Sequence, residues 1–368
     1  MDITLVILSA GNSNRFNSVT KKQWLRIGNK PLWKFVADRL NSFYHFKKTI
    51  ITANKDEIKL YKMLSDYHIV EGGYSRQQSL KKAIKNVKTE YILVTDVARA
   101  CVPKQIILNL IENIKTFDCV VPYLKAVDTI VFENETIDRE KVKLIQTPQL
   151  SKTDILQKAL ETDIEFTDDS SAIKAIGGKI NYIIGSEEAK KITFKGDEKL
   201  SCLQKERKNY IFTGNGYDIH QFEENKKMYL CGIEINSEFG FKAHSDGDVA
   251  IHSLIDALLG ASGYGDIGEF FPDNDPKFKD IDSKKLLKYV VDLLEKTGFE
   301  IINIDITIIA ETPKLKNYKK EMKKSIQTLT KCENVNIKAT TNEKLDSIGE
   351  KKGVAVISTT NITYKEEI

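Results

Sequence analysis

Asp218, His220 and His252 are the side chains of this sequence whose types and spacing are best suited to chemistry. Asp218 and His220 are two residues apart at the end of a segment, 210–219, whose pattern predicts a strand, so both side chains point to one face of it. His252 follows Gly247 in an apolar run, 249–259, that predicts a helix and could supply a third ligand from a facing element. Two imidazoles and a carboxylate, with a fourth position open, are typical of a catalytic rather than a structural zinc site.

Chance occurrence is the alternative to this interpretation, because an Asp-x-His pair is common in unrelated sequences. The chain has only five His, however, and three of them (His220, His244, His252) fall in these two short segments. Four Asp accompany them, namely Asp218, Asp246, Asp248 and Asp256. Core histidines do not usually cluster with carboxylates, so the clustering favours a metal or phosphate site. Asp246 and Asp248 are expected to support ligands or to cap turns.

The second half of the sequence resembles 2-C-methyl-D-erythritol 2,4-cyclodiphosphate synthase in a series of long motifs that follow the family's order. They cover 214–220, 243–249, 256–260, 265–268, 271–273, 305–310, 313–314, 338–341 and 343–345. Such a run is a very specific indication. One segment departs from the family, because 346–353 lacks the usual aromatic residue and has Glu350 in place of an Arg. In the family this segment lies near the central contact of a trimer.

This resemblance implies a reaction in which the 2-phosphate of a CDP-bound, phosphorylated methylerythritol attacks the β-phosphorus and expels CMP. It implies Zn²⁺ or a similar divalent metal on Asp218, His220 and His252, and Mg²⁺ on Glu343. The other implied contacts are Asp266 with the erythritol hydroxyls, His244 and Ser245 with phosphate, Ala310, Pro313, Lys314 and Leu315 around the cytidine, and Thr340 and the catalytic Thr341 near the phosphates.

The first half opens with a buried-strand pattern, 4–8, that runs into a loop of small residues, 9–14. Strand-like stretches recur at 48–52, 91–95 and 118–122, and they alternate with helical patterns at 31–43, 75–87 and 103–115. This alternation predicts a doubly wound domain with a mostly parallel sheet, which binds ligands at the carboxyl ends of its strands. Asp96 lies at such an end, where a carboxylate can hold the magnesium of a nucleoside triphosphate; the alternative is a turn or helix cap.

The first half resembles 2-C-methyl-D-erythritol 4-phosphate cytidylyltransferase in the motifs around 9–11, 72–79, 96–99, 147–149, 167–169 and 191–193. The resemblance implies that the phosphate of methylerythritol 4-phosphate attacks the α-phosphorus of CTP and expels pyrophosphate. It places catalytic cations at Arg15, Lys22 and Lys191, a magnesium ligand at Asp96, and cytosine contacts at Gly73 and Ser79. It assigns Arg139 and Thr147 to the methylerythritol phosphate, across a subunit boundary.

The whole chain is α/β by these patterns, with 368 residues that accommodate two domains. We expect a Rossmann-like nucleotidyltransferase domain over 1–205 and an α+β cyclodiphosphate synthase-like domain over 208–368, with a charged linker near 196–209. Five scattered Cys predict reduced, half-buried thiols rather than disulfides.

The net charge of +4 is small against 56 basic and 52 acidic residues, and no basic block is interleaved with aromatics. A nucleic-acid partner is therefore not expected. No apolar run approaches the ~20 residues of a membrane span, and no signal segment begins the chain, so no membrane and a cytoplasmic location are expected.

The leading hypothesis is a bifunctional enzyme of non-mevalonate isoprenoid precursor synthesis, acting on small-molecule substrates as a homo-oligomer with a trimeric synthase core. The substrate of the second reaction carries a 2-phosphate that the first does not add, and neither half has a kinase motif for ATP. A separate kinase must act between them, and contact with it is possible. The alternatives are a cytidylyltransferase for another sugar-alcohol phosphate, such as ribitol phosphate, and a second half that is a zinc-binding assembly module.

Overall fold

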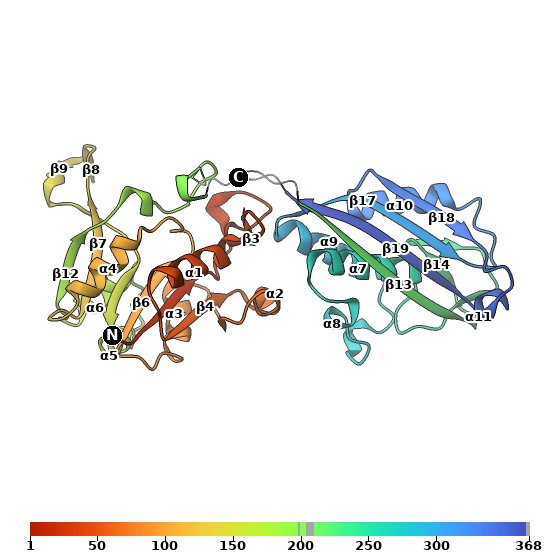
Figure 1. Cartoon of the computed structure of the whole chain (residues 1–368), viewed down its shortest axis with the longest axis horizontal. Coiled ribbons are helices and arrows are strands. Elements are labelled where there is room, and N and C mark those ends of the chain that lie inside the picture. The colour runs from red at the N-terminus through yellow and green to blue at the C-terminus, as the bar shows by residue number, and fades with distance from the viewer. Residues whose placement is uncertain (198, 204–209, 366–368) are drawn as a thin grey trace. The chain divides into compact units, whose positions relative to one another are not determined.

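The computed structural model describes residues 1–197, 199–203 and 210–365, without the side chains of Arg15 and Ser201. The chain forms two compact units, Met1–Arg207 and Lys208–Glu367 (Figure 1). The predicted boundary, between residues 205 and 208, lies outside the described residues. Each unit is a mixed α/β fold built on one large sheet, which confirms the predicted fold class.

The first unit is organised by an eight-stranded sheet whose central strands, β1 and β6, are buried at every position. The strand order is β10-β7-β11-β6-β1-β4-β5, with β12 paired to β7. The strands are β1 (Ile3–Leu8), β4 (Lys48–Ala53), β5 (His68–Glu71), β6 (Tyr91–Asp96), β7 (Cys119–Lys125), β10 (Lys143–Ile145), β11 (Gln149–Lys152) and β12 (Ile180–Ile184). Strands β5, β4, β1 and β6 are parallel as predicted, whereas β11 is antiparallel to both of its neighbours and β10 is antiparallel to β7.

Helices cover both faces of this sheet. Alternate residues of each strand point to opposite sides, so each face has side chains against which a layer of helices packs. On one face Val6, Ile50 and Ile92 form a core with Leu80 and Ile173 from the covering helices. That layer consists of α3 (Arg76–Ile84), α5 (Thr153–Ala159) and α6 (Asp169–Ala175). The remaining helices of the unit are α1 (Leu32–Phe43), α2 (Ile58–Leu64) and α4 (Lys104–Asn113). Two short ribbons complete the unit, β2 (Arg26–Ile27) with β3 (Lys30–Pro31) and β8 (Ile130–Phe132) with β9 (Glu135–Ile137).

The prediction that all five cysteines are reduced is wrong for one pair. Cys101 and Cys202 form a disulfide with a Cα–Cα distance of 5.6 Å, although 101 residues separate them. The reason is that the segment after β12 returns to the loop after β6, so part of the expected linker packs on the first unit, where Leu203 is buried. Cys119, Cys231 and Cys332 are free and buried.

The second unit is a five-stranded sheet covered by helices on one face (Figure 1). The strand order is β16-β13-β19-β17-β18, and all pairs are antiparallel except β17 with β18. The strands are β13 (Ile211–Glu224), β16 (Phe239–Phe241), β17 (Phe299–Ile309), β18 (Val335–Thr340) and β19 (Gly353–Tyr364), with a separate hairpin of β14 (Met228–Leu230) and β15 (Ile233–Ile235). The helices are α7 (Val249–Ser262), α8 (Ile267–Phe270), α9 (Ser283–Lys296), α10 (Lys319–Thr330) and α11 (Asp346–Gly349).

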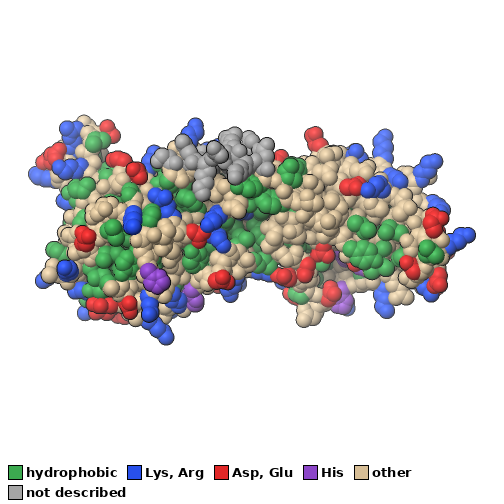
Figure 2. Space-filling model, viewed as in Figure 1, with side chains coloured by type: hydrophobic (Ala, Val, Ile, Leu, Met, Phe, Trp, Pro, Cys, Tyr) green, Lys and Arg blue, Asp and Glu red, His purple; other side chains and the backbone are tan. Residues whose placement is uncertain are grey.

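The face of the molecule drawn in Figure 2 mixes basic and acidic side chains over both units. Among the described residues, no helix combines the length and the apolar character needed to cross a membrane.

Candidate metal and nucleotide sites

Two glycines bring helix α7 close to strand β13 and so create the first site. Gly214, Gly216, Asp218 and His220 alternate along β13 on the face that α7 covers. A Cβ on Gly216 would lie 1.9 Å from the carbonyl oxygen of Ser253, and one on Gly214 would lie 2.0 Å from that of Ala257. Any larger residue at either position would push the helix away, so the glycines allow the approach that carries His252 to the strand.

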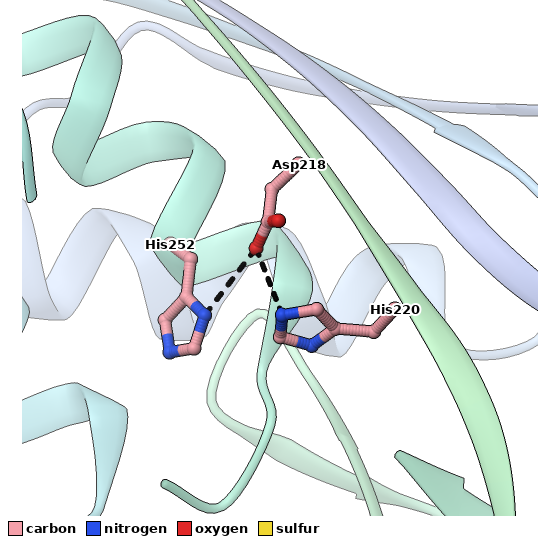
Figure 3. A group of neighbouring side chains, drawn as sticks. All are labelled: Asp218, His220 and His252. Atoms are coloured by element: carbon pink, nitrogen blue, oxygen red, sulfur yellow. Dashed lines mark ion pairs between the residues drawn. The ribbon is translucent and has the colours of Figure 1, made fainter. Parts of the chain in front are cut away.

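Asp218, His220 and His252 converge as the sequence predicts (Figure 3). The Oδ2 atom of Asp218 lies 3.1 Å from Nε2 of His220 and 3.3 Å from Nδ1 of His252. One ligand atom from each residue falls within 4.8 Å of the other two, and no other trio of His, Cys, Asp or Glu among the described residues does so. Two imidazole nitrogens and one carboxylate oxygen are a donor set that suits zinc.

Hydrogen bonds fix the ring of His220 for this role. Its Nδ1 lies 3.1 Å from the carbonyl oxygen of Gly247, which can only accept, so Nδ1 carries a hydrogen and Nε2 faces Asp218. Burial alone would raise the pKa of Asp218, but hydrogen bonds and charge from His220 and His252 outweigh it and lower that pKa. Burial alone would lower the pKa of His220, but Asp218 outweighs it and raises that pKa. A proton on His220 and a metal cation would each compensate Asp218, so the two compete for the same position.

A cavity of about 340 Å³ adjoins the three side chains. His244 and Ser245, the predicted phosphate contacts, line it. Asp266 is exposed beside it and caps α8, where its Oδ1 accepts the N–H of Glu269 at 3.0 Å. Asp256, one turn beyond His252, also lines the cavity and accepts the N–H of Ile267 at 2.7 Å. The α7–α8 connection thus forms one wall.

The other predicted contacts of this unit gather at the same end of the sheet but three strands away. In the strand register Ile219 pairs with Ala355, Ala355 with Ile309, and Ile309 with Thr340. At about 4.8 Å per strand, this row separates Thr340 from β13 by roughly 14 Å. The N–H of Ala310 donates to the carbonyl oxygen of Thr340 at 2.9 Å, which joins the 310–315 segment to the end of β18. Within one chain these residues do not line the cavity beside the metal cluster.

Glu343, the predicted magnesium ligand, lies in an unusual stretch of backbone. Glu343, Lys344 and Asp346 all have positive φ angles, of 51°, 62° and 50°. Such φ values cost non-glycine residues energy and persist where surrounding contacts hold them. Glu311 supplies such contacts, because its Oε1 accepts the N–H groups of Asn342 and Lys344, each at 3.1 Å. The Glu343 carboxylate is exposed and accepts the hydroxyl of Thr341 at 2.7 Å.

The first unit has a larger cavity, of about 610 Å³, at the carboxyl ends of β1 and β6. It brings together five of the predicted residues, which are Lys22, Gly73, Ser79, Asp96 and Lys191. The loop of small residues that follows β1 forms another wall. The hydroxyl of Ser79 accepts the N–H of Gly73 at 3.0 Å, which holds the 72–75 loop over the start of α3.

Asp96 is compensated by cations on both of its oxygens. Its Oδ1 accepts from Nε of Arg76 at 3.2 Å, and its Oδ2 accepts from Nζ of Lys191 at 2.6 Å. Burial alone would raise the pKa of Asp96, but Arg76 and Lys191 outweigh it and lower that pKa to about 2. The carboxylate is therefore charged at any physiological pH.

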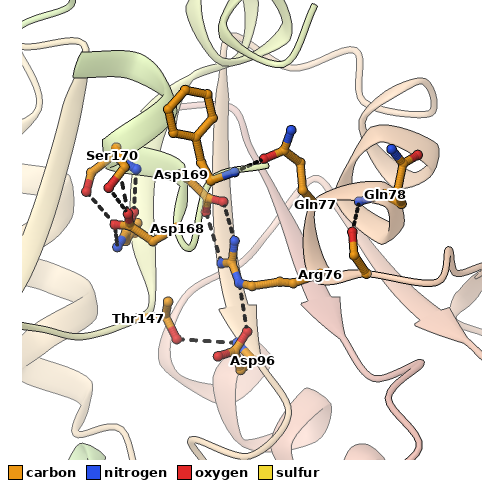
Figure 4. Close-up of polar contacts among 12 residues, drawn as sticks. Arg76, Gln77, Gln78, Asp96, Thr147, Asp168, Asp169 and Ser170 are labelled. Carbon is orange, nitrogen blue, oxygen red and sulfur yellow. Dashed lines mark hydrogen bonds and ion pairs between the residues drawn. The ribbon is translucent and has the colours of Figure 1, made fainter. Parts of the chain in front are cut away.

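Asp169 holds Arg76 in place and was not singled out from the sequence as a site residue (Figure 4). Both of its oxygens accept from the guanidinium, at 2.7 and 3.3 Å, and the residue is only 2% exposed. Its neighbour Asp168 instead caps α6 by accepting the N–H of Ser171 at 3.2 Å. Two adjacent carboxylates at a helix start were visible in the sequence, but no local feature distinguished the cap from the buried partner.

Several contacts fasten Lys191 beside Asp96. The N–H of Ile192 donates to the carbonyl oxygen of Ala98 at 2.9 Å, and Arg99 donates to that of Ala189 at 2.7 Å. The Cys101–Cys202 disulfide joins the same two segments. Lys22 reaches them as well, because its Nζ donates to the carbonyl oxygen of Ile192 at 2.7 Å.

Two predicted residues of this unit, Arg139 and Thr147, do not line the cavity. Arg139 lies on an exposed turn beside the β8–β9 ribbon and donates to the carbonyl oxygen of Val127 at 2.8 Å. Thr147 is 5% exposed, and its hydroxyl accepts the N–H of Asp96 at 3.4 Å, so within this chain it supports Asp96 from behind. The side chain of Arg15 lies outside the described part of the structure.

Comparisons with known proteins agree on both units. Residues 3–202 match the family 2-C-methyl-D-erythritol 4-phosphate cytidylyltransferase, and residues 211–363 match the YgbB family. A relative from Aliarcobacter butzleri, named bifunctional enzyme IspD/IspF, is 55% identical over 99% of this chain and 98% of its own. A relative of the same name from Campylobacter jejuni is 51% identical over 99% of this chain and 98% of its own. The solved structure of the bifunctional IspDF from Campylobacter jejuni is similar with a TM-score of 0.85 and 49% identity, over 99% of both chains.

Proposed function

Because the chain belongs to the bifunctional IspD/IspF enzymes, a cytidylyltransferase joined to a cyclodiphosphate synthase in isoprenoid precursor synthesis, we propose that the cavity beside Asp96 and the cavity beside Asp218 are the sites of these two reactions. The convergence of Asp218, His220 and His252 beside a cavity is the observation that carries the proposal for the second half. The gathering of Lys22, Lys191 and Asp96 supports it for the first half.

In the first reaction a phosphate oxygen of methylerythritol 4-phosphate attacks the α-phosphorus of CTP, and the bond to the leaving pyrophosphate breaks. The phosphorus centre is crowded and anionic, so the reaction depends on positive charge more than on a general base. Lys22 and Lys191 supply this charge in the cavity, together with Arg15. Gly73 and Ser79 hold the cytosine, and Thr147 stabilises the Asp96 backbone.

Asp96 is the residue of this cavity that suits Mg²⁺, which proteins bind through one or two carboxylates and the phosphates of the substrate. In the chain alone its oxygens are held by Arg76 and Lys191. Oδ2 is the oxygen that becomes free when Lys191 turns to a phosphate, whereas Arg76 remains fixed by Asp169.

In the second reaction the 2-phosphate oxygen attacks the β-phosphorus of the CDP group, a cyclic diphosphate closes, and CMP leaves. Zn²⁺ or a similar divalent metal, held by Asp218, His220 and His252, supplies Lewis-acid polarisation of a phosphate when bound. His244 and Ser245 bind phosphate oxygens in the cavity, and Asp266 at its edge accepts hydrogen bonds from the erythritol hydroxyls. Thr340 and Thr341 contact the phosphates, Ala310, Pro313, Lys314 and Leu315 surround the cytidine, and Glu343 holds Mg²⁺.

The assembly proposed for the second half is a homotrimer built on the uncovered face of its sheet. Tyr217, Ile219 and Ile357 are 58%, 45% and 41% exposed on this face, where Tyr217 and Ile357 are register partners. Large apolar side chains gathered on a sheet are typical of a surface that another protein covers. A second copy would also bring its own Thr340 and the neighbouring residues to the metal cluster. Within a single chain, Thr340 lies three strands away from that cluster. In the first unit, Arg139 lies on an exposed turn, from which it would reach a neighbouring copy of that unit. We place this enzyme in the cytoplasm.

Metal-dependent CMP release is the decisive test. Purified protein is stripped with chelator, supplied with phosphorylated CDP-methylerythritol, and then given Zn²⁺ and Mg²⁺ separately and together. The proposal expects CMP only when metal is restored. Folded, zinc-loaded protein that releases no CMP would contradict the assignment and favour a zinc-binding assembly module.

A further inference from the structure

Ser283 lies directly behind the imidazole of His252. It is the first residue of α9 and is fully buried. Its Oγ is 2.9 Å from Nε2 of His252, while the other ring nitrogen, Nδ1, is 3.3 Å from Oδ2 of Asp218. The ring therefore bridges the metal cluster on one side and α9 on the other.

The direction of the hydrogen bond to His252 follows from the other partner of Ser283, which is Asp246. The Ser283 hydroxyl donates to Oδ1 of Asp246 at 2.5 Å, and the Ser283 N–H donates to Oδ2 at 3.1 Å. An ionised carboxylate only accepts, so the single hydroxyl hydrogen of Ser283 is directed to Asp246. The oxygen then has only lone pairs to offer His252, and Nε2 must carry the hydrogen.

In the neutral ring, this arrangement leaves the lone pair on Nδ1, the atom that faces Asp218, where a metal can accept it. The opposite tautomer, with hydrogen on Nδ1, could not bind a metal through that atom. His220 is held in the same sense by a different acceptor, because its Nδ1–H donates to Gly247 and its Nε2 faces Asp218. Metal-binding histidines generally donate their second N–H to such an acceptor, which fixes both tautomer and orientation.

We propose that Ser283 is a positioning residue of the metal centre, which uses Asp246 to hold its own hydrogen and thereby keeps His252 in the tautomer that binds metal through Nδ1. The inference rests on the proposed function of the Asp218, His220 and His252 cluster. It adds a residue from α9 that no motif of the sequence marked.

Ser245 is the competing candidate for this role. Its Oγ is 3.1 Å from Nε2 of His252, but it also accepts the N–H of Gly247 at 3.1 Å and lines the cavity. A residue that faces the cavity is suited to the substrate, whereas Ser283 is sealed behind the ring. We therefore expect metal affinity to depend on Ser283 more than on Ser245.

The experiment measures metal binding by the full-length chain without substrate. Zinc affinity is obtained by competition with a chromophoric chelator, the Co²⁺ form by its visible absorption bands, and the His252 ring by ¹⁵N chemical shifts in the zinc form. Ser283→Ala is expected to weaken zinc binding about 10- to 100-fold and to shift the His252 ¹⁵N signals. CMP release should recover when zinc is raised to saturation, because the loss is in loading.

Three further variants separate positioning from general damage. Ser283→Thr keeps the hydroxyl and should retain zinc affinity within a few-fold. Asp282→Ala removes the cap of the same helix, since Asp282 accepts the N–H of Lys284 at 2.9 Å, and should lower Tm while leaving zinc affinity unchanged. Ser245→Ala should weaken zinc binding less than Ser283→Ala does. If Ser283→Ala does not fold, Ser283→Cys, with its weaker acceptor, takes its place.

Two outcomes overturn the inference, and they are distinguishable. Wild-type zinc affinity and unchanged His252 signals in folded Ser283→Ala would overturn this inference alone. A wild-type chain that binds neither Zn²⁺ nor Co²⁺ would overturn it together with the metal assignment on which it rests.

Discussion

The cavities proposed for the two reactions each contain an aspartate, which is buried in the case of Asp96 and half-buried in the case of Asp218, but the partners of that aspartate differ. Asp96 in the first unit is held between two permanent cations, Arg76 and Lys191. Asp218 in the second unit is held between two imidazoles, whose nitrogens can donate an electron pair to a metal. The first cavity is therefore suited to the anionic groups of a nucleotide, whereas the second offers electron-pair donors that a metal cation would complete.

The comparison shows how one residue type serves two kinds of phosphate chemistry. A carboxylate beside Lys and Arg keeps these cations in place, and Lys22 adds a further positive charge to the same cavity. A carboxylate beside His competes with protons for the same position that a metal takes. The variants below are ordered from the largest expected effect to the smallest, and each tests whether the two sites behave as differently as their partners imply.

Removal of a metal ligand should have the largest effect. His252→Ala leaves two of the three side-chain donors of the cluster, so zinc should be lost and CMP release should fall at least about 10²- to 10³-fold, the size of a lost electrostatic group in a transition state. Pyrophosphate release from CTP should be unchanged. Zinc is measured by elemental analysis, and a variant that keeps its full zinc content would exclude His252 as a ligand.

Removal of a cation from the first cavity should affect only the first reaction. Lys22→Ala is expected to lower pyrophosphate release about 10²- to 10³-fold with cyclisation intact. Lys21→Ala is the matched control, because Lys21 pairs with Glu57 at 2.5 Å and does not line the cavity. Equal losses in the two variants, or loss of both activities in Lys22→Ala, would contradict the separation of the sites.

Loss of the buried partner of Arg76 should destabilise the first unit. Asp169→Asn leaves the guanidinium with one carboxylate instead of two, and breaking a buried pair of this kind costs about 3 kcal/mol of the free energy of unfolding. Asp168→Ala, which removes the adjacent helix cap, should cost about 1 kcal/mol. Urea unfolding followed in the first unit measures both, and an equal cost would show that Asp169 acts only at the helix start.

Acidification should have the smallest effect of these changes, and it should affect the two sites differently. The pKa of His220 is raised above its ordinary value, so the His220–Asp218 ion pair stabilises the metal-free chain fully below about pH 6.5 and is lost as pH rises through the raised pKa. Protons therefore oppose zinc, and zinc affinity should fall by up to about tenfold per pH unit between pH 7.5 and 5.5.

The first site should respond in the opposite direction and in a different range. Because the pKa of Asp96 is lowered to about 2, its ion pairs are intact above about pH 4 and are lost only as pH falls towards 2. The stability of the first unit should thus be constant over the range in which zinc affinity changes. Chelator competition and urea unfolding at each pH measure the two quantities, and parallel changes would contradict the comparison.

Much of the second site was predictable because its ligands follow local rules. Strand alternation places Asp218 and His220 on one face, and an apolar run beginning at Val249 marks the helix that carries His252. Asp246 and Asp248 were expected in supporting roles, and Asp248 does support the 231–232 turn by accepting the N–H groups of Cys231 and Gly232. The same rules located Asp96 at the end of a buried strand.

The contacts that the sequence did not reveal join residues far apart in the chain. Asp169 reaches Arg76 across 93 positions, and Cys202 reaches Cys101 across 101. The antiparallel position of β11 could not be read from its four residues, because so short a run has the same pattern in either direction. Thr147 is buried beneath Asp96 only because the segment before β11 passes under the end of β6.

The sequence by itself determined the two families, the alternating strands and helices, and the identities of the proposed metal donors, because these depend on residue types at short spacing. Only the tertiary structure decided which carboxylate holds Arg76, which oxygen orients His252, and how far Thr340 lies from the metal cluster. The physical reason is that a hydrogen bond acts over about 3 Å. Whether two segments far apart in the sequence come within that distance is decided by the register of the sheets and by the close approach of α7 to Gly214 and Gly216, not by any local pattern.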